Sequence, residues 1–228
     1  MISRRASKTK PEDQFRYALV PDSADARLFV ELSGYANADL NPALHALESA
    51  IRLENTGDPD MHVRYLIEFA VVAYCRAFFH SNVRGRLTDH LEIRTEFATL
   101  HGEVCAFRNT TVAHSQSELS TTWPVLLIGQ SGEPYVRDLL GANYSQTLPL
   151  PRVRALVTLI DVLVDEIDTL LAPVRARLLA TARSLPVPAP TQTMPGIHHE
   201  LDDTFNPRTR RTQYPLTQTL YMQAEPAE

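Results

Sequence analysis

Arg108 and His114 are the residues of this sequence that could do chemistry together, because a fixed cation and a titratable ring beside one phosphate suit the cleavage of RNA. An arginine stays cationic at any working pH and can fork onto two phosphate oxygens. A histidine with a pKa near ~6.5 can take or give a proton at neutral pH. RNA carries its own nucleophile, the 2′-hydroxyl, so the protein needs to supply only an acid or base and a cation for the charged phosphorane. We therefore expect no metal and no other cofactor.

We assign His114 the acid–base role, Arg108 the phosphate contact, and Asn109 the role of a polar partner that orients one of them or the substrate. Ser115 and Arg76 are weaker candidates, both for substrate binding. Each assignment has a structural alternative. A histidine near a helix end often caps carbonyls, and an arginine near acidic residues often pairs with them. Ser115 can simply solvate its segment, and the apolar surroundings of Arg76 favour packing with a satisfied polar tip.

The stretch that holds these residues resembles the active-site motif of the HEPN superfamily. It reads Cys-Ala-Phe-Arg-Asn-Thr-Thr-Val-Ala-His-Ser from Cys105 to Ser115, and Tyr74–Arg84 ahead of it is rich in aromatic and arginine residues. The resemblance covers roughly Met61 to Ser117 by motif. It implies a metal-independent endoribonuclease that leaves a 2′,3′-cyclic phosphate. It also implies a homodimer in which the motifs of two copies meet at the interface.

The same resemblance leaves three function classes open. The first is an active ribonuclease, either a toxin or a phage-defence effector, restrained by a partner such as a cognate antitoxin. The second is a non-catalytic helical dimer that binds nucleotide, RNA or protein. The third is a substrate-binding partner of a nucleotidyltransferase. Retention of Arg108, Asn109 and His114 favours the first class.

The spacing of the motif sets a geometric condition on the helix that carries it. In a straight α-helix, at about 100° per residue, Arg108 and His114 lie about 120° apart and share no face. One solution is a break or kink near Asn109–Thr111, where helix propensity is low. The other is convergence of the two side chains from different subunits.

The elements that position the motif are expected to be mainly α, arranged as an HEPN-like helical bundle over residues 21–184. Apolar periodicity predicts helices over Asp25–Tyr35, Pro42–Glu54, Met61–His80, Thr88–Phe107 and Pro151–Leu171, with a turn at Asn37–Asn41. Pro173 should kink or end the last of these, and helix should resume to about Ser184.

A short β-hairpin is predicted before the last long helix, with strands at Thr121–Ile128 and Pro134–Leu139. Two strands alone are barely stable, so we expect the hairpin to pack against the bundle. Residues 1–20 are expected to form a flexible arm. Residues 185–228 are expected to form a Pro/Thr-rich tail without regular structure. The tail contains His198 and His199, but we expect no metal site because no scaffold fixes a ligand geometry.

Composition restricts the function further. The net charge of −5 argues against a protein that coats nucleic acid by bulk charge, although a local basic cleft remains compatible with it. The longest apolar run, Leu66–Cys75, is about half of the ~20 residues that a membrane span needs. We therefore expect a cytoplasmic protein without a membrane partner.

Four further residues are of chemically interesting types, but for each of them we prefer a structural interpretation. Cys75 and Cys105 show no disulfide or metal spacing and are expected to be buried thiols in a reducing compartment. His101 lies four residues before Cys105 and could serve it as a base, but no oxyanion feature accompanies the pair. Arg84, in the polar loop after Tyr74–His80, is expected to be a simple loop charge.

Overall fold

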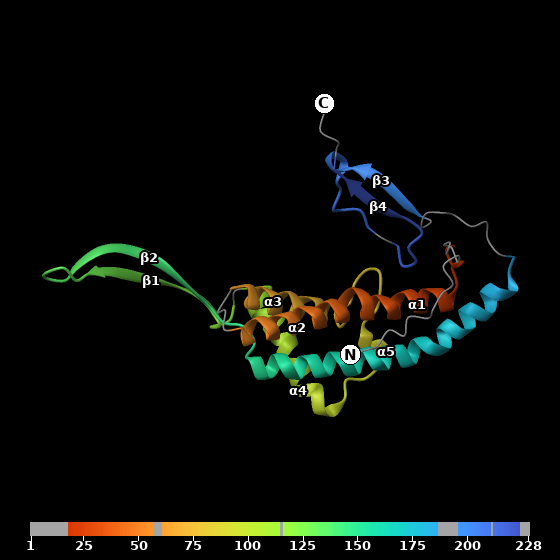
Figure 1. Ribbon diagram of the computed structural model, residues 1–228, viewed down its shortest axis with the longest axis horizontal. Helices are drawn as coiled ribbons and strands as arrows, with labels where there is room; N and C mark the ends of the chain where they lie inside the picture. The colour runs from red at the N-terminus through yellow and green to blue at the C-terminus, as the bar shows by residue number, and fades with distance from the viewer. Residues whose placement is uncertain (1–17, 57–60, 115, 187–195, 211, 224–228) are drawn as a thin grey trace. The chain divides into compact units, whose positions relative to one another are not determined.

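The computed structural model of the chain describes residues 18–56, 61–114, 116–186, 196–210 and 212–223. It is mainly helical, with a small antiparallel hairpin, as the sequence predicts (Figure 1). The chain divides into two units, Phe29–Pro173 and the combination of Met1–Leu28 with Val174–Glu228. The residues of the motif belong to the first unit.

The first helices follow one another without a turn. α1 (Ala24–Gly34) continues into the π-helical segment η1 (Tyr35–Leu40) and then into α2 (Asn41–Asn55). The turn expected at Asn37–Asn41 is therefore wrong. Tyr35 and Leu40 are fully buried, and their burial offsets the low helix propensity of the Asn and Asp residues between them.

The next two helices along the chain are shorter than expected. α3 (Met61–Arg76) is followed by a loop and by the 3₁₀ turn η2 (Leu87–Asp89), and α4 (Thr95–Phe107) begins seven residues after the expected start. The reason lies in η2. The Asp89 carboxylate accepts the backbone N–H of Arg86 at 2.7 Å, and Leu87 is fully buried, so this segment is held in a tight turn.

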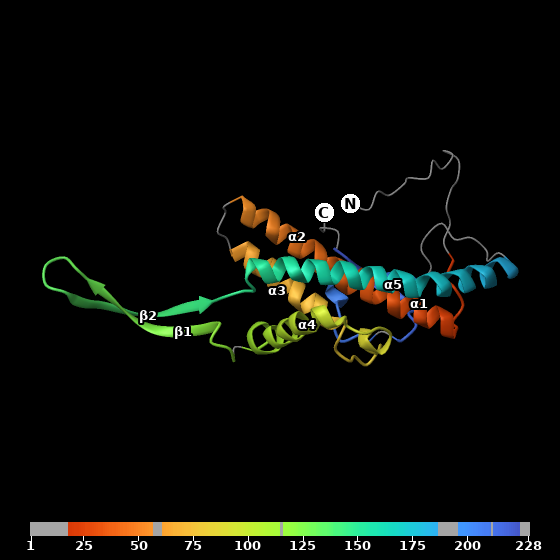
Figure 2. The same ribbon diagram turned by 90° about the horizontal axis from the view of Figure 1, so that it is seen from below.

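The core of the first unit is formed by the apolar faces of the helices, which lie side by side (Figures 1 and 2). α5 (Leu150–Ser184) contributes every third or fourth residue, as its periodicity predicts. Its most deeply buried side chains are Val153, Leu156, Leu159, Ile160, Leu163 and Ile167. The helix runs through Pro173 without ending there, and it stops at Ser184 as expected.

The predicted hairpin is confirmed, and its strands are longer than expected. β1 (Ser120–Gly129) pairs antiparallel with β2 (Tyr135–Ser145), with a bulge after Leu127. Gly132 has φ 86° in the connecting turn, a conformation that favours glycine. The expectation that the hairpin packs against the bundle is wrong, because the large apolar side chains on both of its faces are exposed.

The C-terminal region differs from the expected structureless tail. β3 (Ile197–Leu201) pairs parallel with β4 (Gln218–Met222), and the 3₁₀ turn η4 (Asp202–Thr204) follows β3. An edge-to-face contact between Phe205 and Tyr221, with ring centroids 5.1 Å apart, packs the connection against β4. Composition alone does not reveal this local packing. No helix among the described residues is long and apolar enough to cross a membrane.

Candidate functional site

The motif lies where α4 widens into a π-helix. α4 ends at Phe107, and the π-helical segment η3 (Arg108–Val112) continues it. The backbone N–H of Ala113 donates to the carbonyl of Arg108 at 2.8 Å, which closes the wide turn. The helix thus departs from straight α geometry near Asn109–Thr111, but it widens and continues to Val112 where a break or kink was one of the two expected solutions. Single π-turns inside helices occur frequently at functional sites.

Arg108 is oriented by an aromatic ring and an amide. Its guanidinium carbon lies 5.2 Å from the centre of the Phe79 ring, and Nη1 donates to Oδ1 of Asn109 at 3.1 Å. Its Nε is buried without a hydrogen-bond partner. Within the described residues Arg108 forms no ion pair. Its guanidinium is thus held in place without a carboxylate partner among the described residues, which suits an anion such as a phosphate.

His114 is exposed, and its ring has no hydrogen-bond partner in the part of the chain that the structure describes. The π-turn places Ala113 one turn above Arg108, and His114 follows in the bend after the helical segment. A hydrogen bond joins Arg108 to Asn109, and none joins either of them to His114 among the described residues. Ser115 lies outside the described residues.

A polar hollow follows His114 along the chain. Its volume is about 610 Å³, and it is open to solvent. It is lined by Gln116, Ser117, Glu118, Ser120, Thr121, Thr122 and Asn143. The backbone N–H of Gln116 donates to the carbonyls of His114 and Thr110, at 2.8 and 2.9 Å, which ties the hollow to the motif. Hydroxyl and amide groups can hydrogen-bond to sugar or phosphate, but this lining contains no cation.

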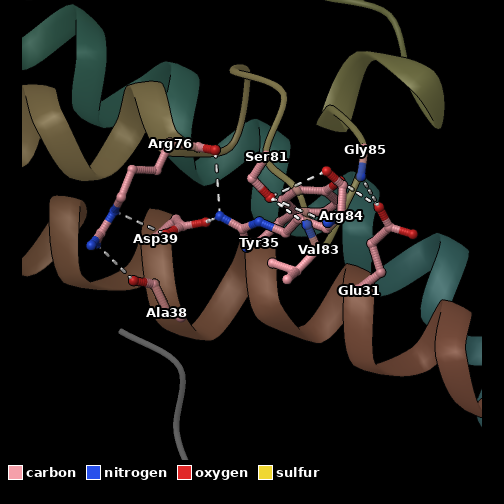
Figure 3. A network of polar contacts seen from close by, with 9 residues as sticks. All are labelled: Glu31, Tyr35, Ala38, Asp39, Arg76, Ser81, Val83, Arg84 and Gly85. Carbon is pink, nitrogen blue, oxygen red and sulfur yellow. Dashed lines mark hydrogen bonds and ion pairs between the residues drawn. The ribbon is translucent and has the colours of Figure 1, made fainter. Parts of the chain in front are cut away.

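Arg76 is engaged elsewhere (Figure 3). Its Nε lies 3.2 Å from Oδ1 of Asp39, and Nη2 donates to the carbonyl of Ala38 at 3.1 Å. The polar end of Arg76 is thus paired within the protein, which is the structural alternative to substrate binding expected for this residue. The side chain is half-exposed. A phosphate at Arg76 would have to compete with the Asp39 carboxylate.

Asp39 is the feature that sequence reasoning missed. It is the one charged residue that is buried among those the structure describes, and it also forms an ion pair with Arg84 (Figure 3). The Arg84 side chain is only 12% exposed and stacks over the Tyr35 ring at 4.8 Å, so the expectation of a simple loop charge is wrong. No sequence signal marks Asp39, because Arg76 and Arg84 lie far from it along the chain.

Glu31 of α1 also binds the loop between α3 and η2, which contains Arg84. One of its carboxylate oxygens accepts the backbone N–H of Gly85 at 2.8 Å and the hydroxyl of Tyr35 at 2.8 Å. Burial and this hydrogen bond raise the pKa of Tyr35, so its hydroxyl stays protonated and donates. Asp39 and Glu31 thus hold the loop after α3 against α1 and η1, and this network serves the scaffold.

A second cluster of reactive groups lies between α3 and α4. The Tyr74 hydroxyl is 2.8 Å from Nδ1 of His101, and Nε2 of His101 is 3.8 Å from Sγ of Cys105. Burial raises the pKa of Tyr74, so its hydroxyl is the donor when His101 is neutral. The imidazole proton then sits on Nε2 and points at Cys105. His101 stabilises a thiolate in this arrangement and does not act as its base.

Cys105 and Cys75 share one charge. A hydrogen bond from the Cys75 thiol, aided by His101, lowers the pKa of Cys105 below that of an ordinary cysteine. The pKa of Cys75 is raised by the same hydrogen bond and by burial. Cys75 is buried, as expected, whereas Cys105 is partly exposed, so the expectation that both thiols are buried is wrong for Cys105.

We expect Cys105 to react with iodoacetamide at pH values where an ordinary cysteine does not. Because the thiolate is the nucleophile, and the pKa of Cys105 is lowered, the pH at which its alkylation rate falls to half should lie well below the ~8.5 of an ordinary cysteine. The measurement is the alkylation rate against pH by mass spectrometry. Cys75→Ala should move the midpoint upward by removing the main hydrogen-bond donor. A midpoint near ~8.5 in the unmodified protein would contradict the prediction.

Comparison of the chain with protein-family models, with curated proteins and with solved structures found no match in any of the three.

Proposed function

We propose that the protein is a metal-independent endoribonuclease of HEPN type, whose site combines Arg108 and Asn109 with His114. RNA supplies the 2′-hydroxyl that attacks the adjacent phosphorus. His114 moves the proton, and Arg108 holds the charged phosphorane. By its resemblance to this superfamily, the protein is a toxin or phage-defence effector. A cognate antitoxin is then its expected partner.

One observation carries this proposal. The Arg108 guanidinium is oriented by Phe79 and Asn109 and has no carboxylate partner within the described residues. His114, in the bend after the widened turn, is exposed and has no hydrogen-bond partner among the same residues. A structural arginine would normally be neutralised. Arg76 and Arg84 in the same unit show that pattern, since both pair with Asp39.

The separation of Arg108 from His114 supports a site made by two copies. Arg108 lies at the start of η3 and His114 in the bend after its end, and no hydrogen bond joins them among the described residues. A second copy would place its own His114 opposite the first copy's Arg108. Asn109 then has a defined role, which is to orient the guanidinium.

The same separation also favours a second candidate function. A helical module that binds nucleotide, RNA or protein without cleaving it would need Arg108 as an anion contact but would not need His114 nearby. The polar hollow beside the motif fits such binding as well as it fits catalysis.

The test is the chemistry of the products. Purified full-length protein is incubated with labelled cellular RNA in EDTA, and the ends of the fragments are identified. Attack by the 2′-hydroxyl leaves a 2′,3′-cyclic phosphate and a 5′-hydroxyl, so a kinase should label the new 5′ ends directly. Fragments that carry 5′-phosphates, or that form only with added Mg²⁺, would contradict the proposed mechanism. Binding of RNA without cleavage would favour the module.

A further inference from the structure

The two cysteines of the chain lie against each other between α3 and α4. Cys75 is the second-last residue of α3, and Cys105 belongs to the last turn of α4. The Cys75 thiol donates a hydrogen bond to the Cys105 sulfur, and its Sγ also lies 4.0 Å from the carbonyl oxygen of Val104. A thiolate is the stronger acceptor of the two, so the Cys75 proton points to Cys105 when Cys105 is ionised. The sequence contains no third cysteine, so within one chain each thiol has only the other as a partner.

The two thiols differ in their access to solvent. Cys75 is fully buried, whereas Cys105 is partly exposed. A small molecule in solution therefore meets Cys105 first, and Cys75 is reached from Cys105. Reactive cysteines are typically partly exposed and lie beside positive groups, whereas buried structural cysteines are inert. The pair thus combines one accessible thiol with one protected thiol.

The side chains around the pair favour a negative charge on Cys105. Nε2 of His101 lies 3.8 Å from Sγ of Cys105, and Nδ1 of the same ring bonds to the Tyr74 hydroxyl at 2.8 Å. The Phe78 ring packs edge-on against the His101 ring, with centroids 4.6 Å apart, which fixes the orientation of the imidazole. The hydrogen bond from Cys75 and the contact with His101 lower the pKa of Cys105, and the hydrogen bond to Cys105 and burial raise the pKa of Cys75. The pair therefore presents a nucleophilic thiolate beside a thiol that keeps its proton.

We propose that Cys105 and Cys75 form a site that reacts with hydroperoxides, in which Cys105 is oxidised first and Cys75 then closes a reversible disulfide between α3 and α4. In the first step the Cys105 thiolate attacks the terminal peroxide oxygen. The O–O bond breaks, a sulfenic acid forms on Cys105, and the leaving alkoxide or hydroxide takes a proton from water. The sulfur loses two electrons, which reduce the peroxide.

In the second step the Cys75 sulfur attacks the Cys105 sulfur. The S–O bond breaks, the S–S bond forms, and the hydroxyl group leaves with the Cys75 proton as water. Because the two sulfurs already share a hydrogen bond, this step begins from groups in contact. A low-pKa, accessible thiol beside a second cysteine is the usual arrangement of a reversible oxidation site. In a reducing compartment, where stable disulfides are rare, the bond would form under oxidation and be reduced again.

The inference does not rest on the proposed ribonuclease activity, and its test uses no RNA. Reduced full-length protein is treated with hydrogen peroxide, and the remaining thiols are blocked with iodoacetamide in denaturant. We expect the intact chain to lose the mass of two hydrogen atoms and to take up no alkyl group. A digest without reductant should contain one linked pair of peptides, with Cys75 in one and Cys105 in the other. Dithiothreitol, added before the iodoacetamide, should restore alkylation of both thiols.

Two variants separate the roles of the thiols, and alanine suits both because free cysteine packs as a small apolar side chain. Cys75→Ala should stop the reaction at the sulfenic acid, which dimedone labels on Cys105. In the unmodified chain the same labelling should be at least about tenfold lower, because the disulfide removes the sulfenic acid. Cys105→Ala is the matched control. It leaves only the buried Cys75, which should stay reduced under the same treatment.

Three results would overturn the proposal. An unmodified chain that keeps both thiols under peroxide would show that Cys105 does not react. Equal dimedone labelling of Cys105 in the unmodified chain and in Cys75→Ala would show that Cys75 closes no disulfide. A disulfide that links two chains, seen on a gel without reductant, would exclude the pair within one chain. If circular dichroism shows that Cys75→Ala is unfolded, the mass and the linked peptides of the unmodified chain still decide.

Discussion

Replacing His114 by alanine is expected to lower the rate of RNA cleavage by a factor of about 10² to 10⁴, the usual contribution of a general acid or base. The loss follows from the proposed chemistry, in which His114 moves the proton. The measurement is the initial rate on labelled RNA in EDTA, after circular dichroism has shown that the variant is folded. Since His114 is exposed and unpaired, its removal should leave stability unchanged.

His45→Ala is the matched control, because the His45 side chain is 76% exposed and lies on α2 away from the motif. It should cleave at the rate of the unmodified protein. Equal cleavage by His114→Ala and the unmodified protein would point to another site or to a contaminating nuclease. Arg108→Ala should lose activity in the same way, and Arg108→Lys should not restore it fully, because lysine lacks the planar fork.

Mixing the two inactive variants tests whether the site is shared. In a mixed dimer of Arg108→Ala with His114→Ala, one of the two sites keeps an intact arginine and an intact histidine. Random pairing makes half of the dimers mixed, so activity should recover to about one quarter of that of the unmodified protein. Activity no greater than the sum of the two variants would contradict a site in which one copy supplies Arg108 and the other His114.

Replacing Asp39 by alanine is expected to cost about 3–5 kcal/mol of folding free energy, the usual cost of removing one partner from a buried ion pair. Asp39 is 3% exposed, and its removal leaves the nearly buried Arg84 without a counter-charge. For a chain of this size the melting temperature should fall by about 10 °C. The measurement is thermal or urea unfolding followed by circular dichroism.

Two further variants decide whether the ion pair is the cause. Adding Arg84→Met to Asp39→Ala should recover part of the lost stability, because the uncompensated charge is removed as well. Asp22→Ala removes a carboxylate that pairs with Arg27 on the exposed surface, and it should have no measurable effect. A loss in Asp39→Ala no larger than in Asp22→Ala would show that the buried pair does not stabilise the fold.

The apolar periodicity of the sequence was sufficient to predict the elements whose buried residues recur at a regular spacing. The helix that begins at Pro151 buries one continuous apolar stripe, and the hairpin has a glycine turn between two β-prone segments, so both are found at the predicted places. Where the prediction fails, contacts between residues distant in sequence determine the local structure. The expected turn at Asn37–Asn41 is helical because Tyr35, Asp39 and Leu40 are buried by segments distant in sequence. The exposure of the hairpin likewise depends on what surrounds it, and periodicity carries no such information.

The candidate site was predictable from the sequence only where its contacts join neighbouring residues. The low helix propensity of Asn109, Thr110 and Thr111 predicts an irregular turn, and the neighbouring Asn109 is the natural partner of Arg108. The contact of Arg108 with Phe79 joins residues 29 positions apart, and no local pattern announces it. The pairing of Arg76 with Asp39 is equally non-local.

The wide turn at Arg108–Val112 makes this segment tolerant of the loss of one residue. A π-turn holds one residue more than an α-turn, so deleting one residue there would restore α geometry, and the residue in the place of Ala113 would still lie one turn above Arg108. The chain that leads into the hairpin would therefore keep its direction. Deleting a residue inside α4 would instead rotate the chain that follows by about 100°. The extra residue of the wide turn thus sets the spacing between the arginine and the histidine without redirecting the rest of the chain.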